Sequence, residues 1–175
     1  MTVDDLISLW GLHPRQASYD WEGVEAHLSA AIPADYRELV DAGGSGLWFR
    51  YIRVFAPDPA LHAQNLLDSA GVFEDVLYFW EDDPETRPGD LLEESRLIAW
   101  ANTEHGEMIF WRVDPGVAPE DFPIYVLDAD YERSERFDMT ATELMMGLKS
   151  GSVVSEILSS SFIDFADPFQ AYPIS

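Results

Sequence analysis

The sequence predicts an α+β fold, in which mostly antiparallel strands occupy the middle of the chain between helical segments. Three observations lead to this prediction. Apolar residues recur at helical spacing near both ends of the chain, and aromatic or β-branched runs fill the middle. A glycine turn joins two of these runs as a hairpin. The 175 residues contain no internal repeat and no linker, so we expect a single domain over residues 1–175.

Three helices are expected in the N-terminal part. Thr2, with Asp5 three residues later, begins the first, Asp20 can cap the second, and Pro33 suits the first position of the third. The apolar residues that follow at helical spacing are Leu6, Ile7, Leu9, Trp10, Trp21, Val24, Leu28, Tyr36, Leu39 and Val40. The residues that end the first and third helices are Gly11, Pro14, Gly43 and Gly44.

The hydrophobic period changes after these helices. Residues 47–55 and 72–80 are apolar, aromatic and β-branched, which predicts two strands. Between them, residues 60–67 have the composition of a helix. Residues 81–90 contain two prolines, a glycine and five acidic residues, so we expect an exposed loop there.

The strongest supersecondary signal is a β-hairpin. Residues 97–102 and 107–113 are apolar runs, and Gly106 lies in the short turn between them, where a positive φ is needed. Residues 124–127 predict another strand, and residues 135–138 a short edge strand.

The C-terminal part predicts further helices. Thr140 and Glu143 have the spacing of a capping box, and Gly151 can end the helix that follows. Residues 153–158 predict a last short helix. The tail over residues 164–175 is rich in proline, aromatic and small residues, and we assign it no structure.

The charge of the chain is strongly unbalanced. It carries 33 acidic residues against 10 basic ones, for a formal net charge of −23. One interpretation is a surface that meets a basic partner; the other is solubility or adaptation to a salty cytoplasm. An acidic surface repels nucleic-acid backbones and anionic membranes, so neither is expected as a partner. The aromatic content of 13% excludes a disordered acidic tail.

Several function classes are disfavoured. There is no cysteine, hence no disulfide, thiolate metal site or cysteine nucleophile. The acidic N-terminus does not resemble a secretory signal, and no apolar run approaches the roughly 20 residues that span a bilayer. We therefore expect a soluble, cytoplasmic protein without a cofactor.

No catalytic or metal-binding constellation is evident. The histidines are scattered, and none lies near another at metal-ligand spacing: His13, His27, His62 and His105. The Gly43–Gly46 cluster follows a helix and precedes a strand, which is the reverse of a nucleophile elbow. The tryptophans beside predicted strands are expected in the core. Paired carboxylates for acid–base chemistry stay open, since 33 acidic residues offer no reason to select one pair.

Three blocks together resemble the SUKH superfamily, which includes a fungal cell-wall-synthesis regulator and many bacterial immunity proteins. The resemblance covers roughly residues 20–158. Its motifs are Trp21-Glu22-x-Val24-Glu25 with residues 32–40 and 43–46; residues 97–102 with 106–111; and Phe137, Thr140, Glu143-Leu144 and Leu148.

The resemblance implies a central, mainly antiparallel sheet flanked by helices, and a binding module without catalytic residues. Bacterial members typically neutralise polymorphic toxins, often nucleases, by binding them. No functional residue carries over by position, because the matching residues are structural.

Three hypotheses follow for function. The first is an immunity protein that binds a basic, nuclease-like toxin, because a nuclease needs a basic surface to hold phosphate. The second is a regulatory scaffold for an endogenous protein, and the third a hydrolase with two carboxylates in a cleft. The expected contact residues are acidic side chains beside an aromatic one: Trp80, Glu81, Asp82, Asp83 and Glu85. The alternative there is a solvated loop with Trp80 in the core.

Overall fold

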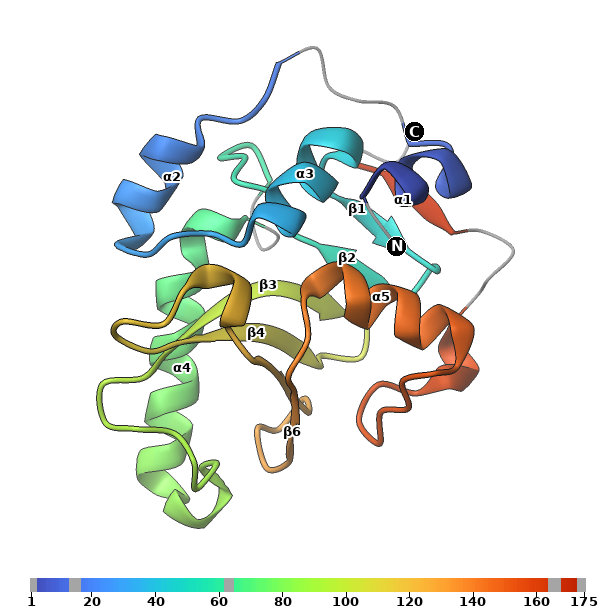
Figure 1. Cartoon of the computed structure of the whole chain (residues 1–175). Helices are drawn as coiled ribbons and strands as arrows, with labels where there is room; N and C mark the ends of the chain where they lie inside the picture. Colours follow the sequence, from blue (N-terminus) through green and yellow to red (C-terminus); the bar gives the residue numbers. More distant parts are fainter. Residues whose placement is uncertain (1–2, 13–16, 62–64, 164–167, 173–175) are drawn as a thin grey trace.

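The computed structural model describes residues 3–12, 17–61, 65–163 and 168–172. Within these residues the chain forms five α-helices and a seven-stranded antiparallel sheet (Figure 1), which confirms the predicted α+β class with a central sheet flanked by helices. The helices are α1 (Val3–Trp10), α2 (Trp21–Leu28), α3 (Ala34–Gly43), α4 (Ser69–Asp82) and α5 (Ala141–Ser150). The strands are β1 (Gly46–Trp48), β2 (Ile52–Val54), β3 (Arg96–Thr103), β4 (Met108–Val113), β5 (Ile124–Leu127), β6 (Ser134–Phe137) and β7 (Phe169–Ala171). Short 3₁₀ helices are η1 (Leu66–Asp68), η2 (Pro84–Thr86), η3 (Pro119–Asp121) and η4 (Ser160–Phe162).

The sheet follows the chain closely. Its strand order is β6-β5-β4-β3-β2-β1-β7, and every neighbouring pair is antiparallel. The predicted hairpin is confirmed as β3 and β4, with Gly106 in the turn at a φ of +98°. The predicted strand over residues 124–127 is β5, and β6 is the expected edge strand.

The two faces of the sheet carry different helices. Trp111 faces α3, whose Tyr36 ring lies 4.7 Å away, centroid to centroid. Leu97 and Arg112 are paired neighbours, and strand alternation turns them to the opposite face. That face meets α4, which packs against β3, whereas α5 packs with α3. Figure 1 shows α3 and α5 on one side of the strands and α4 on the other.

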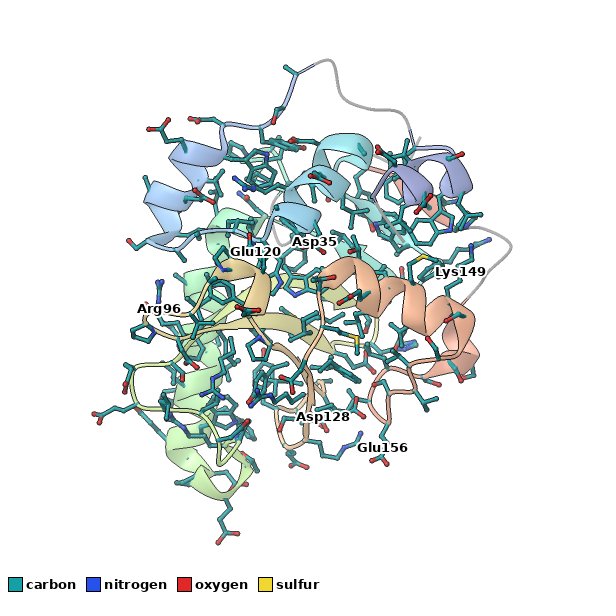
Figure 2. All side chains as sticks on the ribbon, in the orientation of Figure 1. Asp35, Arg96, Glu120, Asp128, Lys149 and Glu156 are labelled. Carbon is teal, nitrogen blue, oxygen red and sulfur yellow. The ribbon has the colours of Figure 1, made fainter. Side chains whose placement is uncertain are left out.

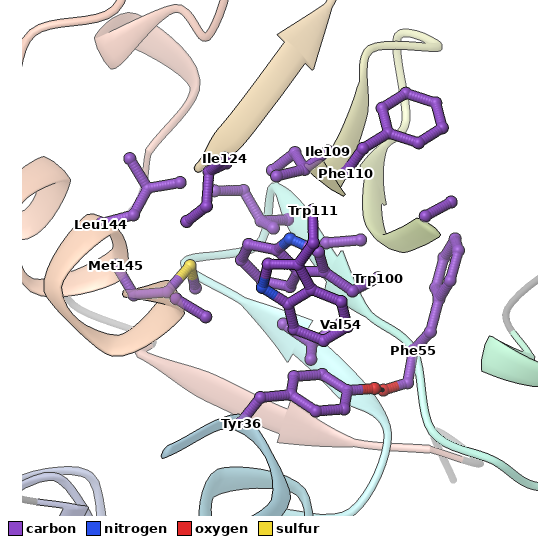
Figure 3. Packing of buried hydrophobic residues seen from close by; sticks show 14 of the residues in the cluster. Tyr36, Val54, Phe55, Trp100, Ile109, Phe110, Trp111, Ile124, Leu144 and Met145 are labelled. Atoms are coloured by element: carbon purple, nitrogen blue, oxygen red, sulfur yellow. Dashed lines mark hydrogen bonds between the residues drawn. The ribbon is translucent and has the colours of Figure 1, made fainter. Parts of the chain in front are cut away.

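The core is built on stacked aromatic rings. Trp100 and Trp111 stack at 5.5 Å, and α5 contributes Leu144 and Met145 beside them (Figure 3). The Tyr36 hydroxyl donates a hydrogen bond to the Phe55 carbonyl, and burial raises the pKa of this phenol well above its ordinary value. Each such aromatic side chain buries roughly 150–250 Å², so these rings contribute a large part of the apolar burial on this face.

The predicted helix starts at Asp20 and Thr140 are confirmed, whereas Thr2 lies outside the described residues. The Asp20 carboxylate accepts from the Gly23 amide at 3.1 Å, and Thr140 and Glu143 form the reciprocal capping box. Pro33 occupies the position just before α3, one residue earlier than expected. Gly151 ends α5 at a φ of +74°. The side chains of Asp20, Thr140 and Glu143 thus satisfy amides that have no partner inside the helix.

Two predictions between residues 47 and 67 are wrong. Residues 47–55 form a tight hairpin of β1 and β2 instead of one strand, because Phe49 and Arg50 take left-handed conformations with φ values of +55° and +54°. The stretch 60–67 is not an α-helix in its described part: residues 60–61 form a turn, and Leu66 and Leu67 belong to the 3₁₀ helix η1. Residues 62–64 lie outside the described residues.

The strand predicted over residues 72–80 is also wrong, because these residues belong to α4. Val72, Val76 and Trp80 recur every fourth residue, which matches one face of a helix. Only Val76 and Trp80 of the three are fully buried, and they lie against the sheet. The apolar composition is that of a strand, but the period is that of a helix.

The C-terminal predictions need two corrections. Residues 153–158 are irregular, because the Glu135 carboxylate accepts hydrogen bonds from the Glu156 and Ile157 amides and replaces a helical pattern there. The tail contains β7, which pairs with β1; Phe169 lies against Trp48 at 4.7 Å between ring centroids. Residues 164–167 and 173–175 lie outside the described residues, as does Pro14.

Candidate partner-binding surface

The predicted contact residues lie at the C-terminal end of α4 and in the turn after it. Glu81 and Asp82 end the helix, Asp83 follows, and Glu85 lies in η2. All four carboxylates are exposed. The predicted loop over residues 81–90 is corrected at its start, because Glu81 and Asp82 belong to α4 and residues 84–86 form η2.

Trp80 belongs to the core and offers a partner almost no surface. Its side chain is 3% exposed, and its indole N–H donates to the Tyr131 carbonyl at 3.4 Å. The Arg87 guanidinium lies over the ring, 6.0 Å from the centroid. Trp80 therefore holds the end of α4 against the sheet and the β5–β6 turn. This matches the alternative in which Trp80 belongs to the core and does not contact a partner.

The exposed aromatic residue is Tyr78, which sequence reasoning missed. Its side chain is 69% exposed. Because the segment is a helix, Tyr78 has Glu81 and Asp82 as neighbours three and four residues on, and Glu74 and Asp75 as neighbours on the preceding turn. A count at the helical period would have found it, since residues 72, 76 and 80 define the inner side and Tyr78 lies opposite them.

We define the acidic face of α4 by its exposed residues Glu74, Asp75, Tyr78, Glu81 and Asp82, together with the exposed Glu85 of η2, which follows the helix. The helix itself contains no basic residue. In the described part of the chain, none of these carboxylates lies within an ion-pair distance of Lys or Arg. The negative charge of this face is therefore uncompensated, with an aromatic ring at its centre.

A different set of carboxylates is bound to arginine on the α4 side of the sheet. The Arg112 guanidinium is 2.8 Å from the Asp114 carboxylate and 3.5 Å from that of Asp90. Arg136 also meets Asp90, at 2.9 Å, and the Tyr125 hydroxyl donates to the same carboxylate. This cluster joins β4, β5 and β6 to the segment that leaves α4.

The cluster keeps its carboxylates ionised. At Asp90 burial raises the pKa, but hydrogen bonds from Tyr125 and Arg136 outweigh it, and the pKa of this carboxyl is lowered. At Asp114 burial is likewise outweighed, by hydrogen bonds from Ser95 and Arg112, and its pKa is also lowered. A general acid needs a raised pKa, so these shifts do not favour the two-carboxylate hydrolase.

The two histidines that the structure describes, His27 and His105, contact other parts of the fold. The His27 Nε2 lies 3.1 Å from the Leu67 carbonyl, which ties α2 to η1. His105 lies in the hairpin turn, with its ring 5.8 Å from that of Tyr51. His13 and His62 lie outside the described residues. Among the residues that are described, no three His, Asp or Glu side chains are placed to hold a metal ion.

Comparison with known proteins gives no match: no family model matches the chain, and neither the curated proteins nor the solved structures contain one that is similar. The helices that the structure describes are all too short or too polar to cross a bilayer.

Proposed function

We propose that this chain is a non-catalytic protein-binding module, and that it binds a basic protein through the acidic face of α4. We further propose that the partner is a nuclease-like toxin domain and that the chain acts in the cytoplasm as its immunity protein. The observation that carries the proposal is Tyr78, exposed at the centre of an uncompensated acidic helix face.

The chemistry of such a partner fits this face. A nuclease holds its substrate by basic residues that neutralise phosphates. An acidic face attracts that surface over a distance, raises the association rate and covers the groups that hold the nucleic acid. Tyr78 supplies what charge alone does not, because a large aromatic ring that becomes buried on binding is a typical hot spot.

The sequence supports the same class. The blocks that resemble the SUKH superfamily indicate a binding module, and the net charge of −23 has no role in folding that would explain it. A regulatory scaffold with an endogenous partner would use the same surface, so the identity of the partner must come from experiment.

The first experiment asks whether the chain protects cells. The candidate partner is a basic toxin domain encoded next to this chain, expressed from an inducible promoter. We expect co-expression of this chain to restore growth, and Tyr78→Ala to reduce the rescue. Binding without any rescue would favour the scaffold. Turnover by the purified chain, abolished by one carboxylate substitution, would overturn the non-catalytic part of the proposal.

The second experiment measures association and dissociation rates with the purified partner. Neutralising E81Q/D82N/D83N/E85Q should slow association at low salt and change dissociation less, because exposed charges act mainly on the encounter. Tyr78→Ala should instead speed dissociation. The matched control E22Q/E38Q/E93Q/E94Q also removes four negative charges, but from exposed positions outside α4 and η2. Equal slowing in both variants would remove α4 from the interface.

A further inference from the structure

A second surface lies on the opposite side of the sheet from α4. A depression of about 490 Å³ runs along the outward side of α5. Its apolar floor is formed by Met139, Met146 and Val153, all of them partly exposed. Leu144, Met145 and Leu148 on the inward side of the same helix lie in the core. Met146 is therefore the outward apolar residue of α5 itself, and Met139 before the helix and Val153 after it complete a floor that is partly exposed in the depression.

The shape of this groove depends on a glycine. A Cβ atom on Gly147 would lie 2.3 Å from Val153 Cγ2, so glycine allows the chain that returns after α5 to lie directly against the helix. The Val153 amide donates to the Gly147 carbonyl at 3.0 Å, which fixes this return. The apolar floor is therefore built into the fold at a position where alanine would favour the helix more.

The rim of the groove is acidic. A second depression of about 340 Å³ adjoins the first and shares Asp138, Met139 and Glu143 with it. Its other side carries Glu120 and Asp121 of η3, both exposed, and Figure 2 shows Glu120 beside the N-terminal end of α5. Neither depression is lined by a lysine or an arginine.

One rim carboxylate is already compensated, and the others are available. Arg136 lies 2.8 Å from the Asp138 carboxylate, so Asp138 contributes little net attraction. The Glu143 carboxylate caps the Thr140 amide with one oxygen, at 2.8 Å, and its side chain remains exposed. Glu120, Asp121 and Glu143 thus supply the negative charge of the rim.

The charge of the rim limits what can cover the apolar floor. A second copy of this chain would bring two acidic rims together, against a net charge of −23 on each molecule. An anionic ligand would be repelled for the same reason. A basic segment with an apolar side chain would bury the floor and pair with the rim at the same time.

We propose that the α5 groove, defined by Met139, Met146, Val153 and the rim residues Glu120, Asp121 and Glu143, binds a segment of a partner protein in which an apolar side chain is flanked by Lys or Arg. The methionines adapt to apolar side chains of different shape, so the groove selects this pattern and not one sequence. The groove and the acidic face of α4 lie on opposite faces of the sheet. The inference therefore does not rest on the function proposed for α4.

The methionines make the groove directly observable. In a chain with ¹³C-labelled Met methyl groups, we titrate the peptide acetyl-KKLKK-amide at low ionic strength. The Met139 and Met146 signals should shift in a saturable way, whereas Met108 and Met145, which are buried, should stay in place. The matched peptide acetyl-KKSKK-amide keeps the charge and lacks the apolar side chain, so it should shift them far less.

Two variants test the parts of the groove. E120Q/D121N/E143Q should weaken binding of KKLKK roughly tenfold, which is about 1.4 kcal/mol, because three exposed carboxylates lose their charge. Glutamine can serve in a capping box, so α5 should stay intact. The control E22Q/E38Q/E93Q removes the same charge elsewhere and should weaken binding much less. M146A should lose most of the difference between KKLKK and KKSKK.

Three results would overturn the inference: no shift of Met139 and Met146, equal shifts with both peptides, or equal weakening by the rim variant and its control. Tyr78→Ala should leave these shifts unchanged. A failure of the α4 proposal and a failure of the α5 groove are therefore distinguishable in the same titration.

Discussion

At the scale of single residues, Gly147 shows how a side chain that is absent can shape a surface. A glycine inside a helix costs up to about 1 kcal/mol relative to alanine. Here a Cβ atom would meet Val153 Cγ2 at 2.3 Å and Val153 Cβ at 2.9 Å. A rotation of the valine could move Cγ2 away, but the contact with Cβ requires the backbone after α5 to move.

We therefore expect Gly147→Ala to lower the free energy of unfolding by roughly 1–3 kcal/mol, as overpacking does, although alanine is the better helix former. Urea unfolding measures it. The matched control is Gly71→Ala in α4, where a Cβ atom would meet nothing within 4 Å. That change should stabilise the chain by up to about 1 kcal/mol. Stabilisation by both changes would contradict the tight contact with Val153.

Arg112 is the other single residue whose surroundings we expect to contribute strongly to the free energy of unfolding. It is 7% exposed and depends on Asp114 and Asp90 for compensation of its charge. Both of these carboxyl groups have a lowered pKa in the folded chain. Their contribution to stability is therefore complete above the ordinary carboxyl pKa of about 3.9 and is lost as the pH falls through the lowered value.

Asp114→Asn should leave the Arg112 charge poorly compensated and cost roughly 3 kcal/mol at neutral pH. The loss should shrink as the pH falls from 4 towards 2, because the native Asp114 also becomes neutral there. Unfolding by urea at several pH values measures both effects, with the exposed Asp130→Asn as control. A loss that stays constant at all pH values would show that the carboxylate charge is not what matters.

At the scale of elements, α4 decides which residues can meet a partner. In a strand, residues 78 and 80 would lie on the same face, because side chains alternate with a period of two. In a helix they are about 200° apart. The structure accordingly places Trp80 in the core and Tyr78 in solvent. The predicted acidic contact residues are exposed in the helix, as they would be in a loop, but the exposed aromatic residue beside them is Tyr78 and not Trp80.

This difference gives a direct test of the element. Trp80→Ala should cost about 3–5 kcal/mol, as for other large buried aromatic residues, whereas Tyr78→Ala should cost less than about 0.5 kcal/mol. Thermal or urea unfolding of both variants gives the comparison. Similar losses for the two substitutions would indicate a strand-like segment and would remove Tyr78 from the exposed face.

At the scale of the whole molecule, the net charge of −23 works against compactness. Like charges at this density repel one another, and only seven ion pairs connect acidic and basic side chains in the described part of the chain. Added salt shortens the screening length to about 8 Å at physiological ionic strength and so relieves this repulsion.

We expect the melting temperature to rise as NaCl is added up to physiological ionic strength. The variant E81Q/D82N/D83N/E85Q should be more stable than the native chain at low salt and respond less to NaCl, because part of the repulsion is gone. Calorimetry in NaCl measures this, with sucrose at matched osmolality as the control for general solute effects. A melting temperature that is independent of salt would show that the acidic residues are too far apart to repel.

Much of the fold followed from the sequence because its signals are local. The Thr140 and Glu143 box, the Gly106 turn and the Asp20 cap each act within a few residues, and each was predicted. Where a local pattern could satisfy two structures, the prediction failed. Phe49 and Arg50 form a turn with positive φ values, which their residue types do not predict. Over residues 153–158, the Glu135 carboxylate of β6 accepts backbone hydrogen bonds that a helix would have made internally.

The candidate binding surface could likewise be predicted only in part from the sequence. The charge, the carboxylates at residues 81–85 and the fold class could be predicted from the sequence, because they depend on composition and on spacing along the chain. The packing of α4 on β3, with Trp80 inward and Tyr78 outward, became clear only from the folded chain. The same holds for the groove that η3, α5 and the chain after α5 line. The physical reason is that exposure is a property of what packs against a side chain, and those neighbours are distant in the sequence.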